Sequence, residues 1–517
     1  PAAAFYEGHP LDLAAYRAKL AEVARRFDRP ARERAAAALR PTSPAAAERL
    51  RRFVEEGGAM VTTGQQTGLF TGPLYTVHKG LSAVRLAEAL EAALGVVVLP
   101  VFWAASEDHD FAEVNHAHAV AADGELHRAE VAATVGAHVP MSEMRLGTDV
   151  ESALGEFAQV VSDDANATAD LALLRDTYSA GRTVAGAFEE TVVRLFAGFD
   201  LLVTDAADPA LKAASRDVLL GELERAEAHE RAVAERSARL AEGGHPPQVA
   251  VMEGATNVFI HGPGGRERLY RDGGGFVAHD SGHRLTLEEA RALLETDPAR
   301  LSPNVFLRPV VESAVFPTLA YVGGPAETAY FAQIQPLFAA FGIRMPVIFP
   351  RFSATIVPEE IALLAESLGI SDDELRLPEH ELVDRVARSR MPPAVWDATN
   401  ALRRVLVDGF GRVIDAAHPI DANLDLAVGG RRNRALLEAA KAERTIIRHF
   451  KKRHPGLIRD VRRVRNHLRP LGVPQERVLT LFQYLARDPD LLRKIAERMT
   501  VALRPEPARE EALASAD

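Results

Sequence analysis

The segment from Ala59 to Ala105 constrains the fold more than any other part of the chain. It opens with a short apolar run at 59–63, passes through a glycine-containing loop, and continues as the helix-like stretch HKGLSAVRLAEALEAAL (78–94). A second apolar run, GVVVLPVFWAA (95–105), follows directly. A strand, a helix and a second strand of these lengths form a right-handed βαβ unit, which seeds a parallel sheet. We therefore predict an α/β fold with a Rossmann-like parallel-sheet core.

Three later apolar runs are able to extend this sheet. They are DLLVTDAADP (200–209), PTLAYVGGPAETAY (317–330) and RMPVIFPRFSAT (344–355), and each places small or polar residues just after a strand-length segment. Ligands of open parallel sheets bind beyond the carboxyl ends of the strands. We therefore expect the polar residues that follow each run to converge at one edge of the sheet.

Two stretches interrupt the parallel pattern and are interpreted as insertions. The first, 121–198, contains weak strand signals and then amphipathic helices. The second, 248–300, is antiparallel in character, because glycines at 262, 264, 265 and 273–275 fall where hairpin turns belong. Thr286 and Glu289 have the spacing of a capping box that starts the next helix. The first fifty residues are interpreted as helices broken by Pro30, Pro41 and Pro44.

Beyond about residue 370 the chain is helical and charged. The stretch 431–454 carries an apolar stripe, and its antiparallel partner is expected at 395–414, with Gly429–Gly430 between the two helices. Such a hairpin needs another apolar surface, and a second copy of the chain is the simplest supplier, so we predict a coiled-coil homodimer. The predicted segments are 1–120 (N-terminal helices and first part of the core), 121–198 and 248–300 (insertions), 199–247 and 301–370 (rest of the core), 371–455 (coiled coil) and 456–517 (C-terminal helices).

Composition limits the class of protein. A chain of 517 residues with 47% hydrophobic and 26% charged residues is expected to form about two to four globular domains. The longest apolar runs have the length of strands, and the N-terminus lacks the pattern of a secretion signal, so no membrane partner and a cytoplasmic location are expected. The absence of cysteine excludes disulfides, thiolate metal sites and thiol nucleophiles.

Charge is distributed unevenly along the chain. The net charge is −11, which disfavours general nucleic-acid binding, yet 431–469 holds fourteen Lys or Arg against three acids, a local +11. Two interpretations stay open for this segment: a solvated helix face, or a surface that contacts phosphate groups.

The loop TTGQQTGLFTGPLYTVHKG (62–80) is the first candidate site. It is neither a Walker A loop nor a dinucleotide fingerprint, because no Gly-Lys-Ser/Thr follows and the glycines are spaced four apart. It offers backbone N–H groups, neutral donors and positive charge near a helix N-terminus, which suit a carboxylate or phosphate. The alternative is a tight βα turn without a ligand. The residues concerned are Gly64, Gly68, Gly72, Gln65, Gln66, Thr67, Thr71, His78 and Lys79.

The second candidate is the acidic cluster that follows the strand at 95–105. It contains Glu107, Asp108, His109, Asp110, Glu113 and His116. A histidine beside carboxylates suits acid–base chemistry or recognition of an amine, and it is also able to bind a metal or cap the loop. Neighbouring residues do not point the same way, so we predict no structural metal.

The third candidate follows the apolar run at 317–322. Gly323, Gly324 and Pro325 form a turn, after which Glu327 and Tyr330 share one side of a helix. A carboxylate there is suited to hold an amine or a hydroxyl group. Arg308, Arg344 and Arg351 are placed near neighbouring strand ends, where they are able to clamp a carboxylate or phosphate.

Five stretches together carry a family resemblance. In order they are TGQQTGLFTGPLYTVHK, PVFWAASEDHDFAEVNH, SPNVFLRPVVESAVFPTLAYVGGPAETAY, MPVIFPRFS and PQERVL. They resemble the bacillithiol synthase family, the cysteine-adding enzymes of bacillithiol biosynthesis, over nearly the whole chain. The resemblance implies a core similar to that of class I aminoacyl-tRNA synthetases, with two insertions and a dimerising coiled coil.

The resemblance also implies a reaction, namely ligation of L-cysteine to the amine of glucosaminyl-malate, with ATP or ADP and Mg²⁺ as suspected cofactors. The rival functions are another amino-acid ligase or nucleotidyltransferase on the same core, and a dimeric scaffold or nucleic-acid-binding protein. In the main interpretation the catalytic residues are His78, Lys79, Asp108 and His109, and the nucleotide-binding residues are Gly64, Gly68 and Gly72. The substrate-binding residues are Gln65, Gln66, Thr71, Tyr75, Trp103, Glu107, Asp110, Glu327, Tyr330 and Arg351.

Overall fold

The computed structural model describes residues 2–134, 136, 138–161, 167–262 and 265–505. The chain forms two compact units. The first comprises residues 1–119, 128–354 and 479–517, and the second comprises residues 120–127 and 355–478. The finer division into seven segments stays a prediction.

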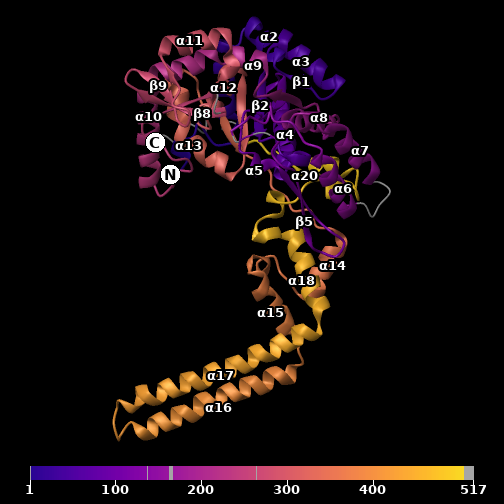
Figure 1. Cartoon of the computed structure of the whole chain (residues 1–517), viewed down its shortest axis with the longest axis vertical. Coiled ribbons are helices and arrows are strands. Elements are labelled where there is room, and N and C mark those ends of the chain that lie inside the picture. Colours follow the sequence, from indigo (N-terminus) through magenta and orange to yellow (C-terminus); the bar gives the residue numbers. More distant parts are fainter. Residues whose placement is uncertain (1, 135, 137, 162–166, 263–264, 506–517) are drawn as a thin grey trace. The chain divides into compact units, whose positions relative to one another are not determined.

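A six-stranded sheet forms the centre of the first unit (Figure 1). Five of its strands run parallel, and they are the five predicted from the apolar runs. The short strand β1 was not predicted. It pairs antiparallel at the edge, where Pro41 is tolerated because an edge strand needs no donor on its outer side. The strand order is β1 (Arg40–Pro41), β6 (Leu202–Asp205), β3 (Val98–Ala104), β2 (Ala59–Gln65), β12 (Thr318–Gly323) and β13 (Val347–Pro350).

Helices cover both faces of this sheet, which is why its strands read as continuous apolar runs. On one face α1 (Leu13–Arg26) and α4 (Tyr75–Leu94) pack against Val61, Val98 and Val347. On the other face Met60 and Leu99 share a core cluster with side chains of several helices. Among these are α3 (Pro44–Glu56), α10 (Arg216–Glu242), α12 (Arg308–Val315) and α13 (Pro325–Ala340).

A second, five-stranded sheet is antiparallel throughout, as expected from the glycine pattern. Its order is β10 (Arg284–Leu285), β9 (Gly275–Ala278), β8 (Gly265–Asp272), β7 (Ala255–Gly262) and β11 (Leu301–Pro303). Gly273 and Gly274 form the β8–β9 turn at φ +56° and +92°, a region that favours glycine. Gly264 lies outside the described residues. Thr286 and Glu289 form the expected capping box of α11 (Leu287–Thr296).

Shorter elements complete the first unit. Pro30 and Pro44 lie in first turns of helices, so these prolines begin helices rather than break them. The remaining helices are α2 (Arg29–Ala37), α5 (Phe111–Val114), α6 (Asp149–Val161), α7 (Ala167–Thr177), α8 (Val184–Leu195), α9 (Pro209–Ala214), α19 (Phe482–Leu485) and α20 (Leu491–Arg498). A two-stranded ribbon pairs β4 (His116–Val120) with β5 (Leu126–Glu130), and residues 120–127 of this hairpin are assigned to the second unit.

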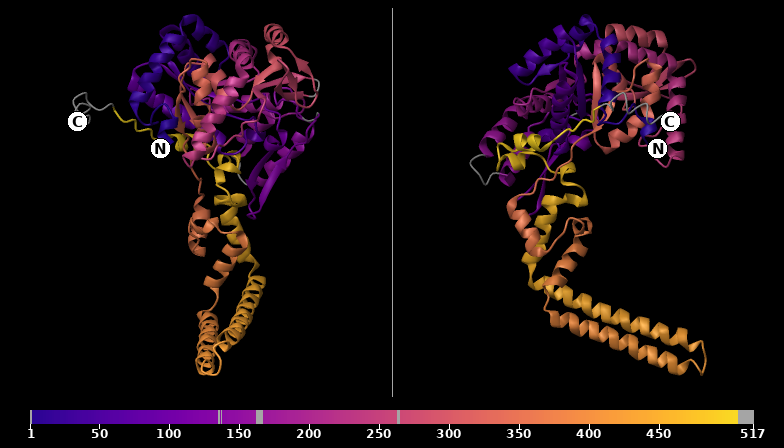
Figure 2. Two further views of the ribbon diagram at one scale, coloured as in Figure 1. Left: turned by 90° about the vertical axis from the view of Figure 1, so that its left-hand side faces the viewer. Right: turned by 180° about the vertical axis from the view of Figure 1, so that it is seen from behind.

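The second unit is helical. Its core joins α14 (Glu359–Leu368), α15 (Glu379–Arg390) and α18 (Pro455–Leu468) through residues such as Leu382, Val386 and Val461. The helices α16 (Pro393–Ala417) and α17 (Leu424–Arg453) lie side by side as an antiparallel hairpin (Figure 2). The predicted coiled-coil architecture is thus present.

The position of the turn in this hairpin corrects the sequence interpretation. Gly429 and Gly430 lie inside α17, and the connection falls earlier, at residues 418–423. There Asp421 accepts a hydrogen bond from the backbone N–H of Asn423 (2.9 Å), and His418 pairs with Asp425 (2.8 Å). Polar side chains therefore form the turn, and the helix tolerates both glycines. Among the described residues, no helix is long and apolar enough to cross a membrane.

Candidate functional site

Polar side chains from several strand ends meet at the carboxyl edge of the parallel sheet, which confirms the predicted convergence. Gln66, after β2, donates from Nε2 to Asp108 Oδ2, after β3 (2.7 Å). Gln65 Oε1, at the end of β2, accepts from Lys79 Nζ (2.9 Å), and Lys79 pairs with Glu327, beyond β12 (2.6 Å). Residues far apart in the sequence thus form one polar cluster.

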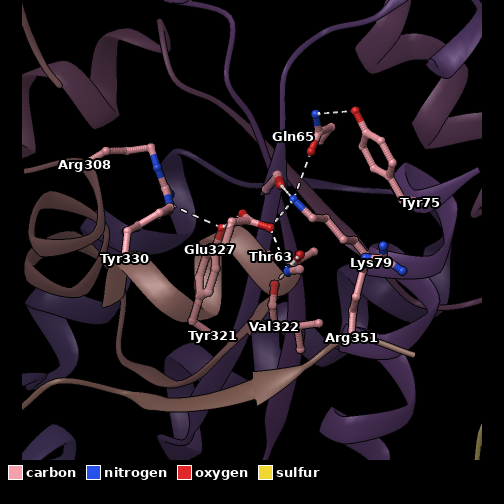
Figure 3. A network of polar contacts seen from close by, with 12 residues as sticks. Thr63, Gln65, Tyr75, Lys79, Arg308, Tyr321, Val322, Glu327, Tyr330 and Arg351 are labelled. Atoms are coloured by element: carbon pink, nitrogen blue, oxygen red, sulfur yellow. Dashed lines mark hydrogen bonds and ion pairs between the residues drawn. The ribbon is translucent and has the colours of Figure 1, made fainter. Parts of the chain in front are cut away.

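Lys79 is the centre of the buried part of this cluster (Figure 3). Its Nζ lies close to three acceptors, Gly64 O (2.7 Å), Gln65 Oε1 and Glu327 Oε2, while the residue is only 4% exposed. An ammonium has three N–H donors, so these contacts occupy all of them. Burial lowers the pKa of Lys79, and Glu327 opposes that shift. In this arrangement Lys79 holds three protein acceptors together, and its catalytic role stays a prediction.

Glu327 is held by donors on both carboxylate oxygens. Tyr321 Oη donates to Oε1 (2.6 Å), and the backbone N–H of Gly324 donates to Oε2 (2.8 Å), the oxygen that also faces Lys79. Burial alone raises the pKa of Glu327, but Lys79 and these donors outweigh it and leave that pKa below its ordinary value. The side chain is therefore an ionised, fixed carboxylate.

Arg308, the first residue of α12, connects this cluster to a cavity. Its Nη1 pairs with Glu312 (2.7 Å), and its Nη2 donates to the hydroxyls of Tyr321 and Tyr330 (3.3 Å each). The guanidinium lies 5.8 Å from the ring centre of Trp103, which lines the cavity. Arg308 therefore carries a buried positive charge to the cavity wall.

The cavity has a volume of about 330 Å³ and lies between the two sheets of the first unit. One wall comes from the end of β3 and the loop after it, with Trp103, Glu107, Asp108 and His109. The opposite wall comes from the antiparallel sheet and the loop after β11, with Phe259, Arg266, Arg268, Asn304 and Arg308. Carboxylates and arginines thus line one small space, which suits a ligand that carries both an amine and an acidic group.

The two carboxylates of the cavity differ in their partners. Asp108 Oδ1 accepts from the backbone N–H groups of His109 (2.7 Å) and Asp110 (3.2 Å), in addition to the Gln66 contact on Oδ2. Glu107 instead forms an ion pair with Lys212, a residue that is 3% exposed and also donates to Leu301 O. Asp108 is therefore held by neutral donors, whereas Glu107 is neutralised by a buried cation.

His109 and Arg266, which both line the cavity, contact each other. Arg266 Nη1 lies 3.4 Å from His109 Nδ1. Arginine only donates, so Nδ1 is the acceptor, and the neutral ring carries its proton on Nε2. Burial and the positive charge of Arg266 lower the pKa of His109. Nδ1 of His109 is thus occupied by Arg266, and the catalytic role of His109 stays a prediction.

The arginines of the second sheet are fixed by contacts of their own. Arg266 donates to Ser302 Oγ (3.0 Å) and Pro303 O (2.9 Å), and its guanidinium lies 4.1 Å from the ring centre of Phe259. Arg268 lies 5.0 Å from the same ring. The Phe259 ring thus contacts two guanidinium groups on the same wall of the cavity.

Other residues of the first unit pack closely against the glycine loop. A Cβ at Gly64 would approach Trp103 O to 3.1 Å, and one at Gly68 would approach Gly72 Cα to 3.0 Å. Tyr178 Oη donates to Gly68 O (3.0 Å) and accepts from Thr71 N (3.2 Å). Close packing therefore explains Gly64 and Gly68, and a φ of +69° explains Gly72, whereas nucleotide contact by the three glycines stays a prediction.

Other predicted residues take different places. His78 is fully buried and lies about 100° around α4 from Lys79, so the two side chains leave the helix on different faces. Tyr75 Oη accepts from Gln65 Nε2 (3.3 Å), and Arg351 lies 5.9 Å from the Tyr75 ring centre. Asp110 is exposed beside the cavity. The functional roles of these residues stay predictions.

The expectation for Arg344 was wrong. Arg344 precedes β13, so it lies at the amino end of that strand, where it pairs with Glu7 (3.1 Å). The carboxyl ends, where the site lies, are at the opposite edge of a parallel sheet. Among the residues that the structure describes, no group of three or more His, Asp or Glu is arranged to hold a metal ion.

Sequence reasoning missed the second wall of the cavity. Arg266, Arg268 and Phe259 were assigned to an insertion without a role, and Lys212 and Asn304 were not singled out. One signal was present, because Arg266 and Arg268 alternate along β8 and side chains two apart on a strand share a face. What the pattern does not reveal is that this face meets the end of β3.

Comparisons with known proteins cover almost the whole chain. Residues 2–352 match the family described as bacillithiol biosynthesis BshC, N-terminal Rossmann-like domain, and residues 354–502 match the BshC C-terminal coiled-coil domain. A relative from Solibacter usitatus is 34% identical over 93% of this chain and 90% of its own length. A relative from Koribacter versatilis is 32% identical over 86% of this chain and 82% of its own length. One from Bacillus cereus is 30% identical over 83% of this chain and 80% of its own length. All three carry the name "Putative cysteine ligase BshC".

Proposed function

The chain belongs to the BshC family of bacillithiol biosynthesis, and on that basis we propose that it is a ligase that joins L-cysteine, through its carboxyl group, to the amine of glucosaminyl-malate. The observation that carries the proposal is the cavity in which Glu107 and Asp108 face Arg266, Arg268 and Arg308. The proposed acceptor carries an amine and two carboxylates, so its charges complement the two walls.

In this proposal Asp108 receives the proton of the attacking amine. The reaction forms a C–N bond to the carboxyl carbon of cysteine, breaks the bond to the leaving oxygen, and releases one proton from nitrogen. Asp108 lines the cavity and is held by neutral N–H donors, which leaves its carboxylate able to accept that proton. His109, with its proton on Nε2, orients the substrate by donating a hydrogen bond.

The residues of the cavity fit a nucleotide in part. Three arginine side chains lie on one wall, and guanidinium groups match phosphate as well as carboxylate oxygens. ATP, when bound, supplies activation of the cysteine carboxyl group, and Arg266 and Arg268 are the residues that would hold its anionic groups, while Arg308 would hold a carboxylate of the acceptor.

A homodimer is the proposed assembly. Of the 25 residues of α16, all of which the structure describes, none is buried. Large apolar side chains remain exposed on both helices of the hairpin, among them Val405 (67%), Leu426 (83%) and Leu437 (58%). A second copy of the chain, packed on the same hairpin, would cover them.

The test of the proposed function is an assay of the purified chain with glucosaminyl-malate, L-cysteine and Mg-ATP, with products followed by mass spectrometry. We expect the cysteine adduct to form together with AMP or ADP, and no adduct when ATP is omitted. L-Serine in place of cysteine separates this ligase from one that accepts other amino acids. Absence of the adduct under every condition would contradict the proposal.

Matched variants test the role of Asp108 in the same assay. Removing a general base costs about 10²–10⁴-fold in rate, so Asp108→Asn is expected to lower kcat by at least about a hundredfold. Glu151→Gln makes the same change of charge at an exposed position on α6 and should leave kcat unaltered. Near-normal turnover of Asp108→Asn would remove this carboxylate from the proton transfer.

A further inference from the structure

A chain of buried hydrogen bonds runs from α10 to the wall of the cavity. Its members are Glu222 and His229 on α10, Asn257 on β7, and Asn304 just after β11. Their exposed fractions are 0%, 3%, 9% and 5%. Of the four, only Asn304 lines the cavity. Burying a carboxylate is costly unless it is hydrogen-bonded, so the arrangement calls for an explanation.

Glu222 is the acceptor end of this chain. Its Oε1 accepts from the backbone N–H of Asn257 (3.0 Å) and from Asn257 Nδ2 (2.9 Å), and its Oε2 faces His229 Nδ1 (2.6 Å). Oε1 is thus the acceptor for both Asn257 donors. Asn257 therefore presents its Nδ2 to Glu222 and its Oδ1 to the other side.

The orientation of the Asn257 amide, which Glu222 fixes, in turn fixes the orientation of the Asn304 amide. Asn257 Oδ1 accepts from Asn304 Nδ2 (2.8 Å), which leaves Asn304 Oδ1 for the backbone N–H groups of Phe306 (2.9 Å) and Leu307 (3.0 Å). The backbone N–H of Arg308 donates to Asn304 O (2.9 Å). Asn304 thus caps the turn from which α12 starts. If Asn304 were flipped, its NH₂ group would face those N–H donors, so the direction of the chain matters.

The stretch Leu301–Asn304 also accepts hydrogen bonds from two further cations, Lys212 and Arg266. Lys212, the partner of Glu107, donates to Leu301 O, and Arg266 donates to Ser302 Oγ and Pro303 O. A shift of this stretch would therefore move the hydrogen-bond partners of Arg266, Arg308 and Lys212 together.

We propose that Glu222 and Asn257 are positioning residues for the cavity: through Asn304 they hold the Leu301–Asn304 stretch and aim Arg308 at the bound anion. The role of the anion rests on the proposed function, whereas the placement of Arg308 does not. Glu222 lies outside the cavity, so it acts through Asn257 and Asn304 rather than by touching a substrate.

Two substitutions of Glu222 by uncharged residues of similar size separate the loss of the hydrogen-bond acceptor from a change of side-chain volume. Glu222→Gln keeps an amide oxygen for the two Asn257 donors, and a ring of opposite tautomer at His229 accepts from its NH₂ group. Glu222→Met has a similar length but no acceptor, so both Asn257 donors lose their partner and the amide is free to turn.

Trp103 provides a readout that needs no substrate. The chain has two tryptophans, and Trp396→Phe leaves Trp103, 5.8 Å from the Arg308 guanidinium, as the single fluorophore. In that background we expect Glu222→Met to shift the Trp103 emission and to raise KM for glucosaminyl-malate about tenfold, the size of one buried hydrogen bond. Glu222→Gln should retain both the parent emission and the parent KM.

The proposal is overturned if folded Glu222→Met keeps the parent emission and KM, or if Glu222→Gln loses both to the same extent. Should Glu222→Met fail to fold, Asn304→Asp replaces it. That change keeps an oxygen for Phe306 and Leu307 but puts a second oxygen against Asn257 Oδ1, so the emission should shift, and an unchanged emission would contradict the proposal. A parent chain without ligase activity would refute the proposed function alone, because the emission comparison stands without substrate.

Discussion

At the residue scale, neighbours in the sequence have different environments in the fold. Lys79 reaches the polar cluster with every N–H donor engaged, whereas His78, one position earlier, is enclosed in the core. Replacing His78 with alanine would open space in that core. Loss of product from such a variant would therefore not distinguish a catalytic role from a packing defect.

The protonation of His109 is a property that its neighbours control, and this leads to a prediction. Burial and Arg266 lower its pKa, while Asp108 opposes them. Arg266→Gln removes a positive charge, so the pKa of His109 should rise toward the ordinary value of 6.5. Asp108→Asn removes a negative charge and should lower it further. NMR titration of the imidazole carbon, assigned with His109→Gln, measures both shifts, and shifts of the same sign in the two variants would contradict this account.

At the element scale, glycines inside helices have two different causes. On α4, a Cβ at Gly80 would lie 2.6 Å from the Phe196 ring, so glycine is required for the approach of that ring. On α17, a Cβ at Gly429 or Gly430 would meet nothing within 4 Å among the described residues. The first glycine serves packing, and the other two only loosen their helix.

This difference predicts opposite effects of one substitution. Gly429→Ala should stabilise α17 by about 1 kcal/mol, the difference in helix propensity between the two residues. Gly80→Ala should destabilise the first unit, because the added methyl group overlaps Phe196. Thermal unfolding followed by circular dichroism measures both changes. A loss of stability in Gly429→Ala would show that another surface packs closely on this part of α17.

At the scale of the whole molecule, the second unit has the features of an assembly domain. Its basic stretch is neutralised in part, because Lys451 pairs with Asp384 and Arg462 pairs with Glu379. These contacts favour the solvated-face interpretation of 431–469 over a phosphate-binding one. The exposed apolar side chains of α16 and α17 are what a second copy would bury.

The proposed homodimer is tested by sedimentation velocity. Val405→Asp and Leu437→Asp place charges on the exposed apolar positions of the hairpin and should convert a dimer to a monomer without loss of helical content. Leu363→Asp alters an equally exposed leucine on α14, outside the hairpin, and should leave the dimer intact. A parent chain that sediments as a monomer, or a dimer that survives both hairpin changes, would contradict the proposed interface.

The sequence by itself determined the elements whose signal is local. The five parallel strands, the glycine hairpins and the capping box at Thr286 were predictable, because apolar runs, turn glycines and caps are read from neighbouring residues. The convergence of Gln66, Asp108 and Glu327 was predictable as well, since it follows from the polarity of a parallel sheet. The similarity of the core to class I aminoacyl-tRNA synthetases stays an expectation.

Only the tertiary structure decided what faces the end of β3. The arginines of β8, the Lys212–Glu107 pair and the hydrogen bonds from Glu222 to Asn304 join residues that lie 35 to 157 positions apart in the sequence, and no local pattern encodes their distances. The turn of the hairpin was misplaced for a related reason: helix propensity marks glycines as breaks, but side-chain contacts of Asp421 and His418 decide where the chain reverses. Packing also showed that Lys79 is satisfied internally, because burial and partners are properties of the folded chain rather than of its residue types.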